Sequence, residues 1–523
     1  MDLSDNSFEG ELPSNLDMLQ NLTDLVLNNN SFVGSLPLEI GNITSLEGLF
    51  LFGNSFTGTI PVEIGRLHRL NTIYLYDNQM SGTIPRELTN CTSLREINFF
   101  GNHFTGPIPE TIGKLKDLVV LHLRQNDLSG PIPPSMGYCK SLQILALADN
   151  SLSGSISPTF GYLSELFKIT LYNNSFEGPL PRSLLALKNL KTINFSHNRF
   201  SGSFSPLTGS NSLTILDLTN NSFSGPIPST LGNSQNLSRL RLAYNNLTGA
   251  IPSEFSYLTE LNFLDLSFNN LTGDVSPQLP NSHKIEHMLL SNNRFTGQLP
   301  PWSAILQTLG ELDLSYNNFN GRVLSELGSI PEEIGDLAEL QVILDLSKNR
   351  FTGEIPSSLG NLMKLERLNL SFNQLQSKVP SSLGKLTSLH VVNLSSNNLE
   401  GLITSTFSGF PRSSFLKNEG LCGPPLIVFT STVICLVMIY IMLRIWCNWS
   451  KVSISSSDGG AAAKCANNNN NKTGNGEYWN TNMNSSSFGL IPSPDKKNNS
   501  MATTTAAICF FDIKKEGVDN TNI

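Results

Sequence analysis

Residues 237–258 read LSRLRLAYNNLTGAIPSEFSYL, and most of the chain before residue 410 consists of copies of this pattern. One residue of the pattern, Asn245, recurs in steps of 24 residues that are broken only by one step of 23 and one of 32. The recurring asparagines are Asn6, Asn30, Asn54, Asn78, Asn102, Asn126, Asn150, Asn174 and Asn198, then Asn221, Asn245, Asn269, Asn293 and Asn317, then Asn349, Asn373 and Asn397. So regular a period predicts a solenoid of about 17 stacked units. Solenoids present a long surface to a partner and do not enclose a reaction.

Each unit predicts a strand, a turn and a returning segment. Leu240-Arg241-Leu242 alternates apolar and polar side chains, as a short strand with one buried face does. Asn245 lies at the turn behind it, where an amide side chain can both donate to and accept from buried backbone groups. Ile251-Pro252 excludes a helix interior, and residues 254–261 return on the outer side as a loop or short helix. The predicted fold class is therefore an α/β repeat, roughly 80 Å long if its strands lie about 4.8 Å apart.

The composition fits this prediction. A compact fold of 523 residues would divide into several domains, whereas a solenoid grows by adding units. Most of the 40 glycines and 28 prolines occupy the same slots of successive units. The net charge of −8 leaves no basic stripe, which argues against nucleic acid as a partner.

The solenoid is assigned to residues 1–410, and after it the amino-acid composition changes twice along the chain. Residues 411–425 predict a degenerate carboxy-terminal cap. Residues 426–443 carry no charge over 18 residues, about 27 Å as a helix, which just spans a bilayer core. A transmembrane helix is expected over 426–446, because a solenoid offers no core that could bury such a helix. Residues 447–523 predict a disordered, low-complexity cytoplasmic tail.

Twelve N-glycosylation sequons lie in the repeats and together favour an extracellular location. They are at Asn21, Asn29, Asn42, Asn90, Asn173, Asn194, Asn220, Asn236, Asn246, Asn270, Asn369 and Asn393. Cys91 and Cys139 occupy matching places two units apart. That separation of about 10 Å exceeds the reach of a disulfide, so two buried thiols are expected.

The unit LxxLxLxxNxLxGxIPxxLGxL, carried by residues 237–258, resembles the plant-specific class of leucine-rich repeats. The run SFLKNEGLCG at residues 414–423, followed by an apolar span, resembles the ectodomain end of plant leucine-rich-repeat receptor-like serine/threonine kinases. Residues 122–126 (HLRQN) and 233–237 (NSQNL) are similar to the GASSHO-type subgroup. The resemblance covers about residues 1–445. It implies a right-handed solenoid that binds a secreted peptide, recruits a shorter co-receptor kinase and signals through a cytoplasmic kinase.

The chain departs from that family at four places. It begins inside a unit at Met1, without an apolar signal segment or an amino-terminal cap. Between Asn317 and Asn349 two second halves follow each other, as if units had been lost. Cys422 lacks the second cysteine of the cap. No glycine-rich loop, strand lysine, catalytic-loop aspartate or Asp-Phe-Gly motif of a kinase is present, so we expect a chain that is not an enzyme and needs no cofactor.

Side chains that flank the strand leucines are expected on the concave face of the solenoid. Between residues 50 and 244 these positions vary and include aromatic residues, whereas later units repeat Asp-x-Ser or Asn-x-Ser. Aromatic and arginine side chains supply most binding energy at interfaces, so the varied half predicts a recognition surface and the uniform half a scaffold. The candidate ligand-binding residues are Tyr74, Tyr76, Phe100, His122, Arg124, Tyr172, Arg239 and Arg241.

Arg239 and Arg241 flank Leu240 and would present two guanidinium forks, a geometry that suits a carboxylate. The family resemblance implies the same role, since several of its peptide receptors hold a ligand's free carboxy terminus with a similarly placed arginine pair. Two alternatives stay open. The arginines could be ordinary solvated residues, and the aromatic side chains could serve only cross-strand pairing.

Three functions fit these features. The first is a single-pass plasma-membrane protein whose extracellular repeats bind a peptide or protein ligand and which signals through a partner co-receptor kinase. The second is a truncated fragment of a receptor serine/threonine kinase. The third is an inhibitor of a cell-wall enzyme, which plant repeats of this class can also be. The subgroup resemblance implies a tyrosine-sulfated peptide as the first ligand to test.

Overall fold

The computed structural model describes residues 1–275, 283–299, 306–320, 330–426 and 439–445. The chain divides into two units, Met1–Leu436 and Val437–Ile523. The first holds the repeats; of the second, only the helical residues 439–445 are described. No helix within these described ranges is long and apolar enough to cross a membrane. The span expected over 426–446 falls mostly on residues outside the described ranges, and so does the whole tail over 447–523.

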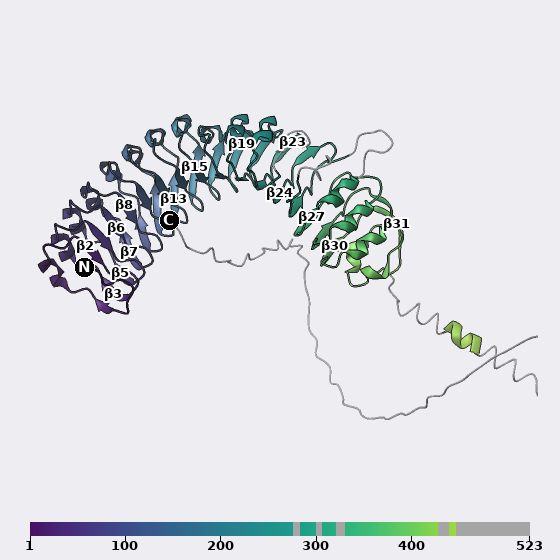
Figure 1. Ribbon diagram of the computed structural model, residues 1–523, viewed down its shortest axis with the longest axis horizontal. Coiled ribbons are helices and arrows are strands. Elements are labelled where there is room, and N and C mark those ends of the chain that lie inside the picture. Colours follow the sequence, from purple (N-terminus) through teal and green to yellow (C-terminus); the bar gives the residue numbers. More distant parts are fainter. Residues whose placement is uncertain (276–282, 300–305, 321–329, 427–438, 446–523) are drawn as a thin grey trace, which may run out of the picture. The chain divides into compact units, whose positions relative to one another are not determined.

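The strands predicted before each asparagine form one parallel sheet, which we call the concave sheet (Figure 1). Its central side chains are buried leucine-type residues, with flanking side chains on the open face, as the alternation predicts. The described part contains sixteen strands in chain order: β2 (Asp24–Val26), β4 (Gly48–Phe50), β6 (Thr72–Tyr74), β8 (Glu96–Asn98), β10 (Val120–His122), β12 (Ile144–Ala146), β14 (Lys168–Thr170), β16 (Thr192–Asn194), β18 (Ile215–Asp217), β20 (Arg239–Arg241), β22 (Phe263–Asp265), β24 (His287–Leu289), β26 (Glu311–Asp313), β27 (Ile343–Asp345), β28 (Arg367–Asn369) and β30 (Val391–Asn393).

A second set of parallel strands follows most of the asparagines and was not expected from the sequence. These flanking strands end at or near a glycine in the left-handed region, such as Gly249 at φ +78°. Thirteen of them form one sheet: β1 (Glu9–Glu11), β3 (Ser31–Ser35), β5 (Ser55–Gly58), β7 (Gln79–Thr83), β9 (His103–Gly106), β11 (Asp127–Pro131), β13 (Ser151–Gly154), β15 (Ser175–Pro179), β17 (Arg199–Gly202), β19 (Ser222–Pro226), β21 (Asn246–Gly249), β23 (Asn270–Asp274) and β25 (Arg294–Thr296). Three more form a separate sheet: β29 (Gln376–Lys378), β31 (Asn398–Leu402) and β32 (Gly420–Cys422).

The returning segments are single turns of 3-10 helix, which corrects the α/β fold class: the described repeats contain no α-helix. A proline precedes most of these turns, and its fixed φ suits the entry to a helix. The turns are η1 (Ser14–Met18), η2 (Leu38–Asn42), η3 (Val62–Arg66), η4 (Arg86–Asn90), η5 (Glu110–Lys114), η6 (Pro134–Tyr138), η7 (Pro158–Tyr162), η8 (Arg182–Ala186), η9 (Ser205–Leu207), η10 (Ser229–Asn233), η11 (Ser253–Tyr257), η13 (Glu332–Asp336), η14 (Ser357–Asn361), η15 (Ser381–Lys385), η16 (Ser405–Phe407) and η17 (Arg412–Phe415).

The recurring asparagines form the predicted internal ladder. Asn126 Nδ2 donates to the carbonyl of Phe99 in the preceding unit at 2.9 Å and to that of Leu123 at 3.2 Å. Its Oδ1 accepts from the backbone N–H of Phe104 at 3.0 Å. One amide therefore satisfies donors and acceptors that water cannot reach.

The ladder crosses the irregular 32-residue step without a break. Asn349 Nδ2 donates to the carbonyl of Leu314 at 2.9 Å, and its Oδ1 accepts from the N–H of Phe319 at 3.1 Å. Strand β27 pairs in register with β26. The extra residues therefore leave the concave sheet intact, although the flanking strands are interrupted there. At the carboxy-terminal cap, Asn418 extends the ladder by one more rung.

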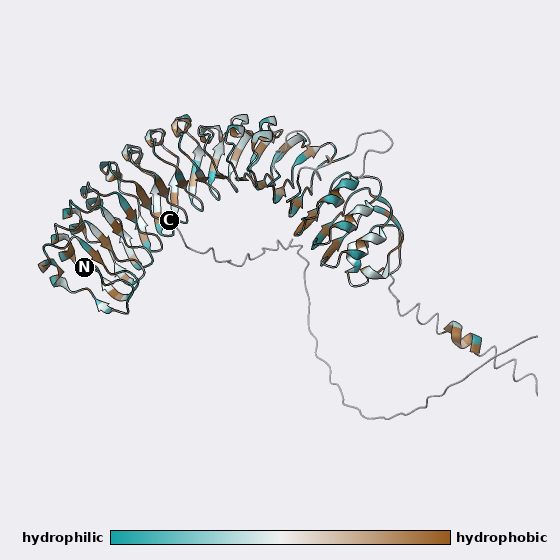
Figure 2. Ribbon diagram, viewed as in Figure 1, coloured by the Kyte–Doolittle hydropathy of each residue, from teal (hydrophilic) through white to brown (hydrophobic). Residues whose placement is uncertain are grey.

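The core is an apolar column between the concave sheet, the flanking strands and the 3-10 turns. Figure 2 shows hydrophobic residues recurring along the strands of successive units. Phe176, Phe200 and Phe223 stack on one another at centroid distances of 6.0 Å. Cys91 and Cys139 are free and buried in this core, as predicted, whereas Cys422 is free and exposed.

Candidate functional site

The concave sheet places all eight candidate ligand-binding residues on one continuous surface. Its strands pair in strict register, so corresponding side chains of neighbouring units lie side by side. The structure does not gather the eight residues into one pocket. It divides them into three clusters along the sheet.

The first cluster consists of four aromatic side chains from two neighbouring units. Phe52 stacks on Tyr76 with ring centroids 4.2 Å apart, and Phe50 meets Tyr74 edge to face at 5.4 Å. The Tyr74 hydroxyl donates to Glu96 in the next unit. Burial is the main cause that raises the pKa of both tyrosines, so their hydroxyls stay neutral. This aromatic cluster offers a half-buried apolar platform to a ligand.

The second cluster is centred on Arg124. Its guanidinium lies between the rings of Phe100 and Tyr172, with 5.5 Å to each centroid, and its Nε donates to Asp149 at 2.8 Å. His122 stacks on Phe100 at 5.4 Å. Burial, reinforced by the positive charge of Arg124, lowers the pKa of His122 to about 4. With His122 neutral, the charged groups of this Arg124 cluster are Arg124 and Asp149, which form an ion pair with each other.

The third cluster is the arginine pair. Arg239 and Arg241 both face the ring of Phe263 in the next unit, with Cζ 5.5 Å and 4.3 Å from its centroid. Arg241 Nη1 also lies 3.9 Å from Asp217 Oδ2 in the preceding unit. The two forks are therefore not equivalent, because Arg241 lies against Phe263 and near Asp217. Arg239 is exposed, and no ion pair joins it to another residue in the described part of the chain.

Three strand steps separate Tyr172 from the arginine pair, roughly 14 Å at the usual spacing between strands. They pass from Thr170 in β14 through β16 and β18 to Arg241 in β20. A single side chain cannot bridge this interval, but an extended peptide of four to five residues can span about 14 Å. The arrangement thus suits an extended ligand that lies along the concave sheet.

The uniform half, together with the last unit before it, carries a feature that the sequence interpretation missed. The residue before each ladder asparagine has a positive φ in almost every unit, and in the first half this position holds residues such as Asp77, Asn173 and His197. Later units place bulky aromatic residues there, for which this backbone region is unfavourable. We call Tyr244, Phe268, Tyr316 and Phe372, together with Lys348 and Lys417, the aromatic row.

The aromatic row is exposed and ordered by its own contacts. Tyr244 stacks on Phe268 at 4.1 Å, and both rings are more than 40% exposed. Lys348 Nζ lies 4.0 Å from the ring centroid of Tyr316 and 5.2 Å from that of Phe372. These aromatic residues are visible in the sequence as AYN, SFN and SYN, triplets that end at the ladder asparagine, but strand alternation does not single out that position.

The twelve predicted sequons fall on different parts of the surface. Asn29, Asn173 and Asn220 directly precede ladder asparagines and are exposed. Asn194, Asn369 and Asn393 instead lie in strands of the concave sheet and are half-buried. Glycans at the latter three would lie over the sheet that carries the candidate clusters. The remaining sequons are Asn21, Asn42, Asn90, Asn236, Asn246 and Asn270.

Comparison with protein families matches the repeats along most of the solenoid. A leucine-rich-repeat model covers residues 211–271, and a second one matches residues 45–67, 93–115, 117–139, 141–163, 189–211, 308–337, 342–362, 364–386 and 388–410. Solved structures of the same fold include the plant peptide hormone receptor RGFR1 in complex with RGF2, at 34% identity and TM-score 0.66 over 80% of this chain and 74% of that one. The chain belongs to the family of leucine-rich-repeat receptor ectodomains.

Two further ectodomain structures are similar to this leucine-rich-repeat chain. The Arabidopsis receptor kinase HAESA, in complex with the peptide hormone IDA and the co-receptor SERK1, shares 33% identity with TM-score 0.71 over 81% of this chain and 74% of that one. The ectodomain of GASSHO1/SCHENGEN3 from Arabidopsis thaliana, in complex with CASPARIAN STRIP INTEGRITY FACTOR 2, shares 40% identity with TM-score 0.52 over 81% of this chain. This chain spans only 62% of that ectodomain. A comparison with the curated proteins finds no match.

Proposed function

We propose that this protein is a cell-surface receptor-like protein whose concave sheet binds an extended extracellular peptide between residues 50 and 244. The observation that carries the proposal is the alignment of an aromatic cluster, the Arg124 cluster and an exposed Arg239 on one sheet surface. The similar ectodomains solved with RGF2, IDA and CASPARIAN STRIP INTEGRITY FACTOR 2 support a peptide as the ligand.

In this proposal each cluster binds a different part of the peptide. The aromatic cluster receives apolar side chains, because half-buried rings gain the most from being covered. Arg239 receives a carboxylate, since it combines a free fork of donors with exposure. Arg241 lies against Phe263 and near Asp217, and it adds positive potential beside Arg239.

We further propose that signalling depends on a partner kinase, with the repeats extracellular and the chain anchored once in the plasma membrane. The aromatic row supports a second protein partner, because aromatic side chains are enriched at protein–protein interfaces and these rings are exposed. The HAESA complex, which contains the co-receptor SERK1, makes a co-receptor of that kind the first partner to test.

Peptide binding can be measured by calorimetry with the full chain and three peptides: RGF2, IDA and CASPARIAN STRIP INTEGRITY FACTOR 2. We expect at least one to bind, and the double variant Y74A/Y76A to weaken it at least tenfold. The control is S315A/S347A, which changes two buried serines beside strand leucines of the uniform half and should leave the affinity within twofold. If none of the three binds, or if both double variants weaken binding equally, recognition by the aromatic cluster is wrong.

The co-receptor contact needs a separate measurement. Y316N/F372N removes two rings of the aromatic row, and asparagine tolerates a positive φ, so the fold should persist. We expect this variant to lose peptide-dependent binding of the SERK1 ectodomain while peptide affinity stays unchanged. Q125N/H197N, at the same position of earlier units, is the control. Unchanged SERK1 binding by Y316N/F372N would contradict the placement of the partner.

A further inference from the structure

A groove lies on the flank of the solenoid where the flanking strands are interrupted. The thirteen-stranded sheet ends at β25, and the next flanking strand in the described residues is β29. Between them, only isolated backbone bonds join the flanks of successive described units, for example from the Arg350 N–H to the Phe319 carbonyl at 2.9 Å. The resulting hollow has a volume of about 610 Å³. No residue that lines it belongs to the concave sheet, so it is separate from the proposed peptide surface.

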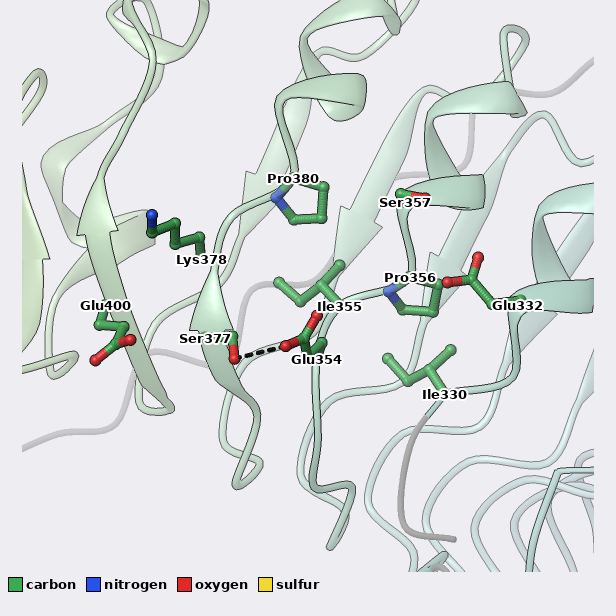
Figure 3. Close-up of a pocket in the computed structure, with 10 residues that line it drawn as sticks. All are labelled: Ile330, Glu332, Glu354, Ile355, Pro356, Ser357, Ser377, Lys378, Pro380 and Glu400. Carbon is green, nitrogen blue, oxygen red and sulfur yellow. Dashed lines mark hydrogen bonds between the residues drawn. The ribbon is translucent and has the colours of Figure 1, made fainter. Parts of the chain in front are cut away.

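Four successive units line this groove, which we call the flank groove (Figure 3). Its floor is apolar and is formed by Ile330, Ile355, Pro356 and Pro380. Its walls hold the ionisable side chains, of which three are glutamates and one is a lysine. The ionisable lining residues are Glu332, Glu354, Lys378 and Glu400.

Within the described ranges, hydrogen-bond donors and not cations contact the carboxylates of the flank groove. Glu354 accepts from the hydroxyl of Ser377 at 2.9 Å, the bond drawn in Figure 3, and Glu332 accepts from the backbone N–H of Ser358 at 3.3 Å. No ion pair within the described ranges involves Glu332, Glu354 or Glu400. A surface with three carboxylates against one ammonium therefore retains a negative potential that complements a cation.

Size and polarity decide which cation fits. Small-ligand sites occupy about 300–1,000 Å³, so the flank groove has room for a long side chain and its neighbours. The methylene groups of an arginine side chain can pack on an apolar surface while its guanidinium group reaches the polar edge of that surface. That fork also pairs with carboxylates in two-pronged geometry, which an ammonium cannot do. The apolar floor and acidic walls of the flank groove present both requirements together.

We propose that the flank groove is a docking site for an arginine-containing basic segment of a protein partner, with the arginine stem on Ile355 and Pro356 and its guanidinium between Glu332 and Glu354. Ser377 contributes by fixing the Glu354 carboxylate. Its hydroxyl donates to that carboxylate. The backbone of Ser377 has a φ of +65°, and most other units have a glycine at this position. This site is independent of the peptide surface and could be occupied while that surface is filled or empty.

The test uses the full chain and the probe acetyl-Gly-Arg-Leu-Arg-Gly-amide. Its counterpart has citrulline, an uncharged arginine analogue of similar shape, in place of both arginines. By calorimetry we expect the arginine probe to bind and the citrulline probe to bind at least tenfold more weakly. Failure of the arginine probe to bind, or equal affinity for both probes, overturns the proposal.

A matched pair of variants separates docking in the groove from general attraction to an acidic protein. E332Q/E354Q/E400Q neutralises the flank groove, whereas E39Q/E63Q/E87Q neutralises three glutamates in the first turns of η2, η3 and η4. We expect the first variant to weaken the arginine probe at least tenfold and the second to change it less than twofold. Equal weakening by both would show general charge attraction only and would overturn the site.

A photo-crosslinking version of the probe locates it directly. With a benzophenone group on the central residue, we expect crosslinks to peptides within residues 330–400 and their loss in E332Q/E354Q/E400Q. Crosslinks confined to residues 50–244 would place the probe on the concave sheet and overturn the proposal.

Discussion

The guanidinium carbon of Arg241 lies 4.3 Å from the ring centroid of Phe263 in the following unit. Arg239 approaches the same ring at 5.5 Å but is more exposed, and only Arg241 is also drawn towards Asp217. One aromatic ring thus orders two arginines of unequal freedom. Arg241 is held by its neighbours, whereas Arg239 is exposed and can bind a ligand, so the two arginines are not equivalent.

This inequality predicts a specific result for Arg239. R239A should weaken a peptide with a free carboxy terminus roughly 10- to 100-fold, because hydrogen bonds to charged groups contribute about 1.5–3 kcal/mol. The same substitution should change the affinity of the carboxy-amidated peptide less than twofold. Calorimetry with both peptide forms measures the coupling between Arg239 and the carboxylate directly.

The control for R239A is R367A, which removes an exposed arginine from the matching first position of β28. It should leave both affinities unchanged. If R239A weakens the amidated peptide as much as the free acid, the arginine does not bind the carboxylate.

Much of this architecture follows from the sequence because the period itself encodes it. The 24-residue step fixes the stacking, and an asparagine in each step fixes the ladder, so strands, buried leucines and the open face could all be located. The same reasoning placed Arg239 and Arg241 on that face. It could not reveal that Arg241 is held, since Phe263 and Asp217 come from different units and only the register across strands brings them together.

Other features depend on backbone conformation and were invisible to side-chain alternation. The aromatic row arises from residues with positive φ, a property that residue type alone would have assigned to Asn or Gly and not to Tyr316 or Phe372. The flank groove depends on where strand pairing stops. The 32-residue step suggested a disturbance, but not that the concave sheet would continue through it while the flanking strands would not.

The ladder predicts a large stability effect at a single buried amide. N126A removes three donor bonds and leaves the Phe104 N–H without its acceptor, so we expect a loss of about 2–4 kcal/mol. Asn6, at the exposed end of the ladder, bonds only within its own turn, and N6A should cost less than about 1 kcal/mol.

Because repeat proteins need not unfold in one step, the two asparagine variants are best compared by native-state hydrogen exchange. The protection of amides within residues 99–128 should fall in N126A and persist in N6A. Equal protection in both variants would mean that the ladder contributes little beyond backbone pairing.

His122 predicts a pH dependence of stability in the acidic range. Burial, followed by the charges of Arg124 and Lys168, lowers its pKa to about 4 from the ordinary 6.5. Between pH 4 and 6.5 the His122 imidazole binds a proton in the unfolded chain but not in the folded chain. The free energy of unfolding therefore rises with pH over this range, and this contribution of His122 reaches its full value above about pH 6.5. NMR titration should find the imidazole neutral at pH 5.5. Denaturation curves should show a weaker rise between pH 4 and 6.5 for H122Q, with the exposed His68 as the control in H68Q; a slope unchanged by H122Q would contradict this assignment.

The buried cysteines predict selective alkylation. Burial raises the pKa of the Cys91 thiol to about 12 and that of Cys139 to about 11, and each thiol donates to a carbonyl, of Ile64 and Ile112 respectively. Since the thiolate is the reactive form, iodoacetamide at about pH 8 should leave both unmodified in the folded protein while it alkylates the exposed Cys422. After denaturation all three should react, as peptide mass spectrometry can establish. Native labelling of Cys91 at the rate of Cys422 would show that the solenoid opens in this region, and a disulfide between Cys91 and Cys139 would contradict the unit spacing itself.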